Sequence, residues 1–142
     1  MLNFMRTFIL LLTFLIARPS LKAQVKKTFY NSFELSDSIK VLNINFGPEA
    51  SVKSWVGSAI LIETQVRIEN GNNSLFKVLK EAGRYDLKEE RIDSLLSLSP
   101  MLKERPIIQN SQGEIQETIS MKVLLPDSFV SADSTLWKKK EE

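Results

Sequence analysis

Apolar and polar residues alternate most regularly between Ser51 and Gly71, where the sequence reads SVKSWVGSAILIETQVRIENG. Along its second half, one set of alternate positions is apolar except for one threonine: Ile60, Ile62, Thr64, Val66 and Ile68. Most positions between them are polar: Glu63, Gln65, Arg67 and Glu69. A period of two is typical of a strand with one buried and one solvated face. We therefore predict a strand from Ile60 to Ile68 whose apolar side needs a second layer to cover it.

Two shorter strands are predicted before this one. Residues 52–55 form the first, and Gly57 supplies the residue that a tight reversal favours. We therefore expect residues 52–55 and 60–68 to form a β-hairpin. Upstream, the segment from Leu42 to Phe46 alternates apolar residues with asparagines, and Gly47-Pro48 ends that strand.

One helix is predicted to interrupt the strands, over residues 74–82. Asn72 or Asn73 caps its start, and Gly83 stands where a left-handed C-terminal residue is favoured. Its apolar stripe consists of Leu75, Phe76, Val78 and Leu79. A helix of about three turns needs support from the sheet to hold its shape.

Further strands are predicted after the helix, starting near Tyr85 and Leu87, from Ile92 to Leu98, and over residues 114–126, with Pro126 as the last terminator. Residues 99–114 contain two prolines and Gly113, which predicts a long hairpin connection. Connections of this length are often either mobile or functional, and mobility is the preferred interpretation. The fold class is therefore mainly β: a β-sandwich or stacked antiparallel sheet with one short helix packed on it.

The first 23 residues, MLNFMRTFILLLTFLIARPSLKA, have the pattern of a secretory signal peptide. Arg6 precedes an apolar run from Phe8 to Ala17, and Ala23 suits a cleavage site. The run is shorter than the roughly 20 residues of a membrane-spanning helix. We expect a single β-rich domain over residues 24–137, exported to the periplasm or the extracellular space, followed by a charged flexible tail over residues 138–142.

Composition changes this picture in two ways. The leader contains three of the 19 basic residues and none of the 17 acidic ones, so its removal changes the net charge from +2 to about −1. This balance gives no support for nucleic-acid binding. The absence of cysteine excludes disulfides and a lipid anchor on cysteine, and favours a bacterial envelope over a eukaryotic secretory route. We therefore expect a soluble exported product with no membrane span after cleavage.

The chain also lacks histidine, the commonest general base and the commonest zinc ligand. Without cysteine it has no thiol nucleophile and no ligand for iron–sulfur clusters. The glycine-rich phosphate motifs GxGxxG and GxxxxGK[ST] do not occur. We predict no catalytic residues, no metal ligands and no cofactor.

Two enzymatic designs survive these exclusions. One is a Ser-Lys dyad, but no serine lies in a diagnostic motif for it. The other is a carboxylate-dependent hydrolase acting on a glycoside. The available acids are Glu63, Asp86, Glu89, Glu90 and Asp93. Strand alternation places Glu63 among solvent-side neighbours, and the segment LKEERID has the composition of a charged turn. We interpret these acids as solvated surface.

A possible partner-binding face is predicted at Trp55, Glu63, Gln65 and Arg67. Trp55 has the opposite parity to Val52 and is expected to point outward, where an aromatic ring on a sheet can stack on a glycan or a protein. Packing within the core or a turn is the preferred interpretation for both Trp55 and Tyr85. At the other end of the domain, Lys138 to Lys140 are expected to be solvated, with docking on an anionic envelope surface as the alternative.

The segment from Leu42 to Ile68 resembles the opening of an adhesin-type domain of unknown function found in bacterial envelope proteins. The matching features are a strand at residues 42–46, a short strand at 52–55, a turn at Gly57 and a long alternating strand at 60–68. The resemblance covers about residues 40–70, and the helix at 74–82 departs from it. It implies an all-β envelope domain with no established enzymatic activity.

Together these features favour an exported, non-catalytic β-rich binding or structural module, adhesin-like, whose partner is a protein or glycan of the envelope. A regulatory accessory protein that senses the state of the envelope through protein contacts would use the same fold. The carboxylate-dependent hydrolase is the third alternative.

Overall fold

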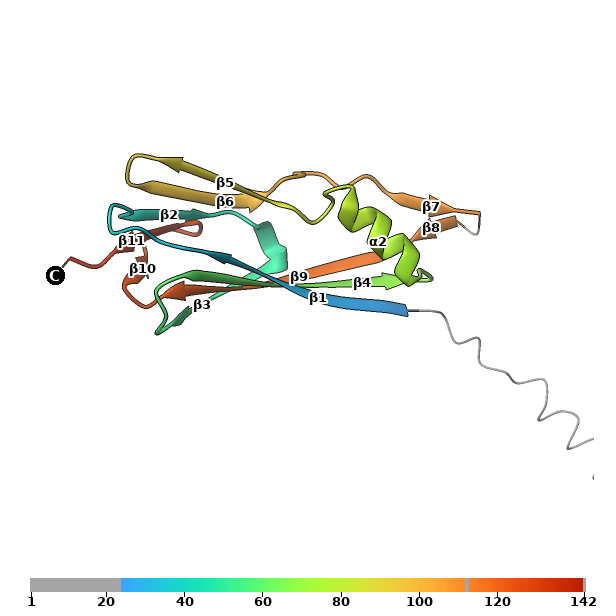
Figure 1. Cartoon of the computed structure of the whole chain (residues 1–142), viewed down its shortest axis with the longest axis horizontal. Coiled ribbons are helices and arrows are strands. Elements are labelled where there is room, and N and C mark those ends of the chain that lie inside the picture. The colour runs from blue at the N-terminus through green and yellow to red at the C-terminus, as the bar shows by residue number, and fades with distance from the viewer. Residues whose placement is uncertain (1–23, 112, 142) are drawn as a thin grey trace, which may run out of the picture.

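A computed structural model describes residues 24–111 and 113–141, so the predicted leader lies outside the described part. Two β-sheets face each other, and a single described helix, α2, lies beside the upper sheet in Figure 1 and covers the rest of the lower one. The chain is therefore mainly β with one short helix, which confirms the predicted fold class. Both main sheets mix parallel and antiparallel pairs, whereas the sequence suggested antiparallel pairs alone.

The first sheet has four strands in the order β1-β4-β9-β3. Their bounds are β1 Gln24–Phe33, β3 Ala50–Trp55, β4 Ile60–Glu69 and β9 Glu117–Pro126. The predicted apolar side of β4 faces the second sheet and the helix, and its residues are fully buried: Ile60, Ile62, Thr64, Val66 and Ile68. β1 and β3 are the two edges of this sheet.

The predicted hairpin between β3 and β4 is wrong. β9 lies between them, parallel to β3 and antiparallel to β4. Their connection is held open by Trp55, whose indole N–H donates to the Ala59 carbonyl at 3.0 Å while its ring fills the space where a Cβ at Gly57 would stand. Gly57 thus serves close packing against the indole, and β9 itself occupies the place between the two strands.

The second sheet has five strands in the order β10-β11-β2-β6-β5. Their bounds are β2 Val41–Ile44, β5 Leu87–Ile92, β6 Leu95–Pro100, β10 Phe129–Ser131 and β11 Leu136–Lys139. The predicted strand from Ile92 to Leu98 is split between β5 and β6, because Asp93 adopts a left-handed φ of 52° and reverses the chain. Lys138 and Lys139 belong to β11, so this strand continues past the predicted start of the tail.

Helix α2, Asn73–Glu81, lies between the residues that the sequence predicts as its caps. The Asn72 side chain accepts a hydrogen bond from the Leu75 backbone N–H at 2.8 Å, and Gly83 takes a φ of 75° just beyond the end. Three residues of its stripe pack against the core: Leu75, Phe76 and Leu79. Val78, predicted in the same stripe, is instead 61% exposed.

The predicted long connection over residues 99–114 contains some regular structure. A two-stranded hairpin forms from β7, Ile108–Asn110, and β8, Gly113–Ile115. Upstream of it, Arg105 Nη1 lies 3.2 Å from a carboxylate oxygen of Glu49, which follows β2 in the 3-10 helix Gly47–Glu49. This contact links the connection to the chain that precedes β3.

Candidate functional site

A buried ion pair lies where the chain leaves helix α2. Arg84 Nη2 is 2.8 Å from Glu117 Oε2, and Arg84 Nε donates to both carboxylate oxygens at 3.1 and 3.2 Å. Both side chains are about nine-tenths buried, at 10% and 9% exposure. Arg84 Nη2 also donates to the Pro106 carbonyl at 2.9 Å. The pair therefore ties the end of α2 to the first residue of β9 and to the connection before β7.

Tyr85 completes this network. Its hydroxyl donates to Glu117 Oε1 at 2.6 Å, and the residue is only 3% exposed. Burial raises the pKa of Tyr85 well above its ordinary value, and the hydrogen bond to Glu117 with the negative charge of that carboxylate adds to the rise, against the smaller opposing effects of Arg84 and Arg105. Tyr85 therefore remains a protonated donor, and the interpretation of this residue as part of the core is confirmed.

The Tyr85 ring in turn fixes two phenylalanines. Phe76 from α2 stacks on it with ring centroids 5.7 Å apart, and Phe29 from β1 lies at 6.0 Å with a tilt of 49°. Lys80 Nζ stands 5.0 Å from the Phe29 ring centroid, within the range of a cation–π contact. The buried ion pair thus positions an aromatic cluster between α2 and β1.

A groove of about 670 Å³ opens beside this cluster, along β1 and α2. Residues of both elements line it, among them Lys27, Phe29, Phe76, Lys77, Lys80 and Glu81. A second hollow of about 340 Å³ shares Phe29 and Lys80 with the groove and reaches Phe33 and Met101. Pockets of this size, with aromatic walls and a few polar groups, are typical of binding sites.

The groove carries an uncompensated positive charge. Lys77 pairs with Glu81 at 3.8 Å within α2. Lys27 and Lys80, by contrast, have no carboxylate within ion-pair distance among the residues that the structure describes. Two ammonium groups beside aromatic rings favour a ligand that has both negative charge and apolar surface.

Strand β1 lines one side of the groove and is also an edge of the first sheet. Within the described chain it pairs with β4 alone, over all ten of its residues. In an antiparallel strand the backbone groups of alternate residues point away from the partner. β1 therefore presents N–H and C=O groups along an edge ten residues long.

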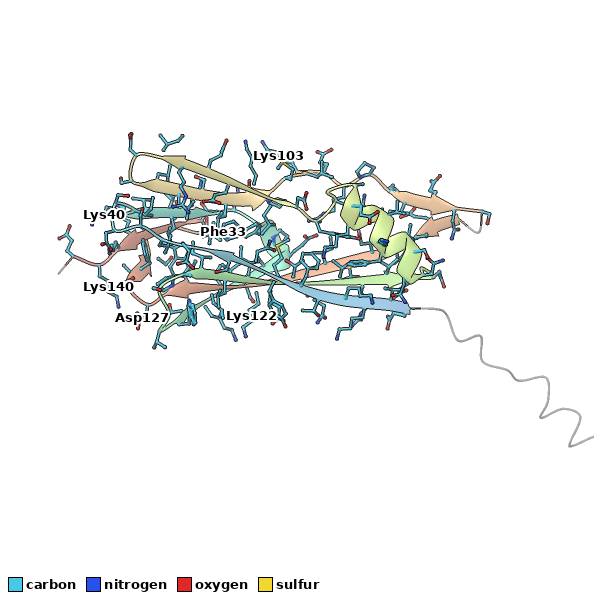
Figure 2. The ribbon with its side chains drawn as sticks, viewed as in Figure 1. Phe33, Lys40, Lys103, Lys122, Asp127 and Lys140 are labelled. Atoms are coloured by element: carbon cyan, nitrogen blue, oxygen red, sulfur yellow. The ribbon has the colours of Figure 1, made fainter. Side chains whose placement is uncertain are left out.

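The predicted partner-binding face is brought together only in part. Glu63, Gln65 and Arg67 form a row on the outer face of β4, the side turned away from the second sheet. Figure 2 shows Lys122, the β9 partner of Glu63, pointing to the same side. Trp55 also lies on this face, but it is separated from the row by β9 and is half-buried against its own turn. The turn-packing interpretation of Trp55 is confirmed.

The acids of the hydrolase alternative are distributed over separate elements. Glu63 lies on the first sheet, while Glu89 and Glu90 lie on β5 of the second. These two are paired with neighbouring cations, Glu89 with Arg91 at 2.6 Å and Glu90 with Lys88 at 2.7 Å. The described residues contain no group of three or more metal-binding side chains.

Sequence analysis missed β1, and with it Phe29 and Lys27. A signal was present, since Val25, Phe29 and Phe33 repeat every fourth position on one parity, but Lys27 and Asn31 occupy the places between them. The pair between Arg84 and Glu117 joins residues 33 positions apart, and no local pattern in the sequence indicates it.

No described helix combines the length and the apolar character that crossing a membrane requires. Comparisons with protein-family models, curated proteins and solved structures find no match to this chain.

Proposed function

We propose that the protein is a non-catalytic, β-rich binding module of the bacterial cell envelope, and that its partner binds in the groove beside β1. One observation carries the proposal: Lys27 and Lys80, both without an acidic partner in the described structure, stand at an aromatic groove along an open sheet edge. The predicted leader and the resemblance to adhesin-type envelope domains support the location.

The rigidity of the groove supports binding. Its aromatic wall rests on the buried contacts of Tyr85, so Phe29 and Phe76 are held in place before a ligand arrives. A wall held in place in advance lowers the entropy that binding would otherwise cost. The hydrogen-bonded ion pair of Arg84 and Glu117 beneath this wall likewise holds the surrounding backbone in place.

The outer face of the first sheet extends this surface. Tyr30 of β1 is 72% exposed and lies directly opposite Glu63 of β4. Gln65 and Arg67 continue the row, next to Thr28 and Lys26 of the same edge strand. The face predicted from the sequence therefore adjoins the groove through β1, and a partner in the groove would reach it.

Site-specific photo-cross-linking in the native cell tests the proposal. A photoreactive residue replaces Lys77 of α2, which lines the groove, or, as the control, Ser51 on the outer face of β3. We expect the mature protein in the periplasmic or extracellular fraction, with a stoichiometric adduct to one envelope component from position 77 and little from position 51. Uncoupled protein at both positions, or protein confined to the cytoplasm, would overturn the proposal, and an adduct from position 51 alone would refute the groove.

A further inference from the structure

We infer that the partner segment in the groove is an acidic peptide in extended conformation, which pairs with β1 as a fifth strand of the first sheet. The inference rests on the proposed function and specifies its ligand. It combines three features of the described structure: the open backbone of β1, the groove on the inner side of that edge, and the unpaired lysines.

The backbone of β1 provides the pairing surface. All ten residues from Gln24 to Phe33 pair with β4 without a break, so the outward-pointing backbone groups repeat regularly over the same length. A strand added at the usual spacing of about 4.8 Å would bond to the outward-pointing groups of every second residue. Recognition of this kind obtains affinity from the backbone and specificity from pockets for alternate side chains.

The groove provides those pockets. The inner-face side chains of β1 include Lys27 and Phe29, which point toward the layer of α2. Side chains of an added strand that point to the same side would enter the space lined by Phe29, Phe76 and Lys80. The opposite side chains would lie beside Tyr30 on the solvated face. The geometry thus selects a peptide whose residues alternate in character.

Charge selects acidic residues. Lys27 and Lys80 line the groove without acidic partners among the described residues, and Lys26 lies on the outer face of the same strand opposite Arg67. Cations therefore flank both faces of the first half of β1. A second copy of this chain would bring the same lysines to the interface, whereas an acidic segment would neutralise them.

The edge strand of the second sheet shows the contrast. Charges on β5 are compensated within the strand, Lys88 by Glu90 and Arg91 by Glu89. Arg91 Nη2 also donates to the Glu34 carbonyl at 2.8 Å, just beyond the end of β1. Charged side chains along an edge hinder its pairing with an arbitrary strand. The charges beside β1 lack this compensation, which favours β1 as the site of strand addition.

Selection from a displayed library of random ten-residue peptides against the purified exported protein tests the inference. Enriched peptides are synthesised, and their binding is measured by fluorescence polarisation. We expect enrichment of Asp and Glu with apolar residues at alternate positions. N-methylation along the peptide should abolish binding at every second position, because only alternate N–H groups donate to β1.

Charge reversal at the groove supplies the matched variants. Lys80→Glu and Lys27→Glu should each weaken binding by about tenfold or more, which corresponds to about 1.4 kcal/mol. Lys53→Glu, on β3 at the opposite edge of the sheet, should leave binding unchanged. Circular dichroism and thermal unfolding of each variant show that the fold is retained.

Three results would overturn the inference. The first is a selection that enriches no peptide, or peptides insensitive to both groove variants. The second is binding of an acidic oligosaccharide such as oligogalacturonate, dependent on Lys80, without any peptide binding. The third is a dimer in sedimentation that Lys27→Glu dissociates. In each case the cross-linking at position 77 still decides separately whether the protein is a binding module.

Discussion

The inner face of the first sheet is covered in two different ways. Over one half, the second sheet buries it with aliphatic side chains such as Leu42, Leu96 and Leu98, all at most 1% exposed. Over the other half, α2 covers it with aromatic rings and the buried contact of Arg84 with Glu117 (Figure 1). The sheet-covered half is filled by buried aliphatic side chains, while the helix-covered half contains buried charge and opens into a groove at β1.

The difference follows from the amount of surface that each cover supplies. A five-stranded sheet presents many side chains at about 10 Å from the first sheet, so aliphatic residues alone fill the space. A nine-residue helix presents only three, and the remaining volume is filled by Tyr85, Phe29 and the ion pair. An apolar layer tolerates exchange among similar residues. A polar network depends on each of its members, because every unpaired buried group costs stability.

The largest effect is expected from Glu117→Ala in the helix-covered half. It leaves the Arg84 guanidinium buried without its anion and should lower the free energy of unfolding by about 3 to 5 kcal/mol. Denaturant unfolding followed by circular dichroism measures this loss. Glu114→Ala, an exposed acid three residues earlier, is the control and should change stability by less than about 0.5 kcal/mol. Equal losses in the two variants would contradict the importance of the network.

In the sheet-covered half, Leu96→Ala removes a fully buried side chain and should cost about 2 to 5 kcal/mol through lost burial and the cavity left behind. Leu124→Ala, half-buried on the outer face, is the matched control and should cost clearly less. Below the unfolding temperature, we expect Leu96→Ala to leave binding in the groove unchanged and Glu117→Ala to weaken it. This result would show that the two halves act independently. Equal weakening by both variants would show that the halves are not independent.

Tyr85→Phe should cost about 1.5 to 3 kcal/mol at neutral pH, because the hydroxyl donates to a charged acceptor. The raised pKa of Tyr85 sets the sign of the pH dependence. Above about pH 10 the unfolded chain releases this proton while the folded protein keeps it, so the contribution of the hydroxyl to stability falls as pH rises. The stability difference between wild type and Tyr85→Phe should therefore shrink at alkaline pH. Tyr30→Phe, which removes an exposed hydroxyl, is the control, and a constant difference would count against the protonated donor.

The smallest effect is a gain. Thr64 is fully buried on the inner face, and its hydroxyl has no hydrogen-bond partner in the described structure. Thr64→Val replaces that hydroxyl by a methyl group of similar shape and should stabilise the fold by about 1 kcal/mol. Thr118→Val, on the exposed side of β9, should have little effect. A loss of stability at position 64 would indicate that the hydroxyl has a partner in solution.

Local features and tertiary contacts differ in how well the sequence predicts them. The faces of β4 and β9 and the ends of α2 follow from local patterns, because alternation and capping act over a few residues. The order of the strands does not, since the pairing of β3 with β9 depends on chain segments about 70 residues apart. The groove was missed for the same reason: its charge and its aromatic wall meet only through tertiary contacts. Three residues of the predicted partner-binding face lie together because they alternate along one strand, β4: Glu63, Gln65 and Arg67.

The position of β9 has a consequence for how the chain reaches its fold. β3 and β4 follow each other directly, yet they must remain about two strand spacings apart until β9, almost 50 residues later, enters between them. During synthesis β3 therefore has no sheet neighbour before Pro126 has left the ribosome. Closure of such long loops slows folding, so the chain spends longer in a partly open state in which β3 and β4 expose their unpaired edges.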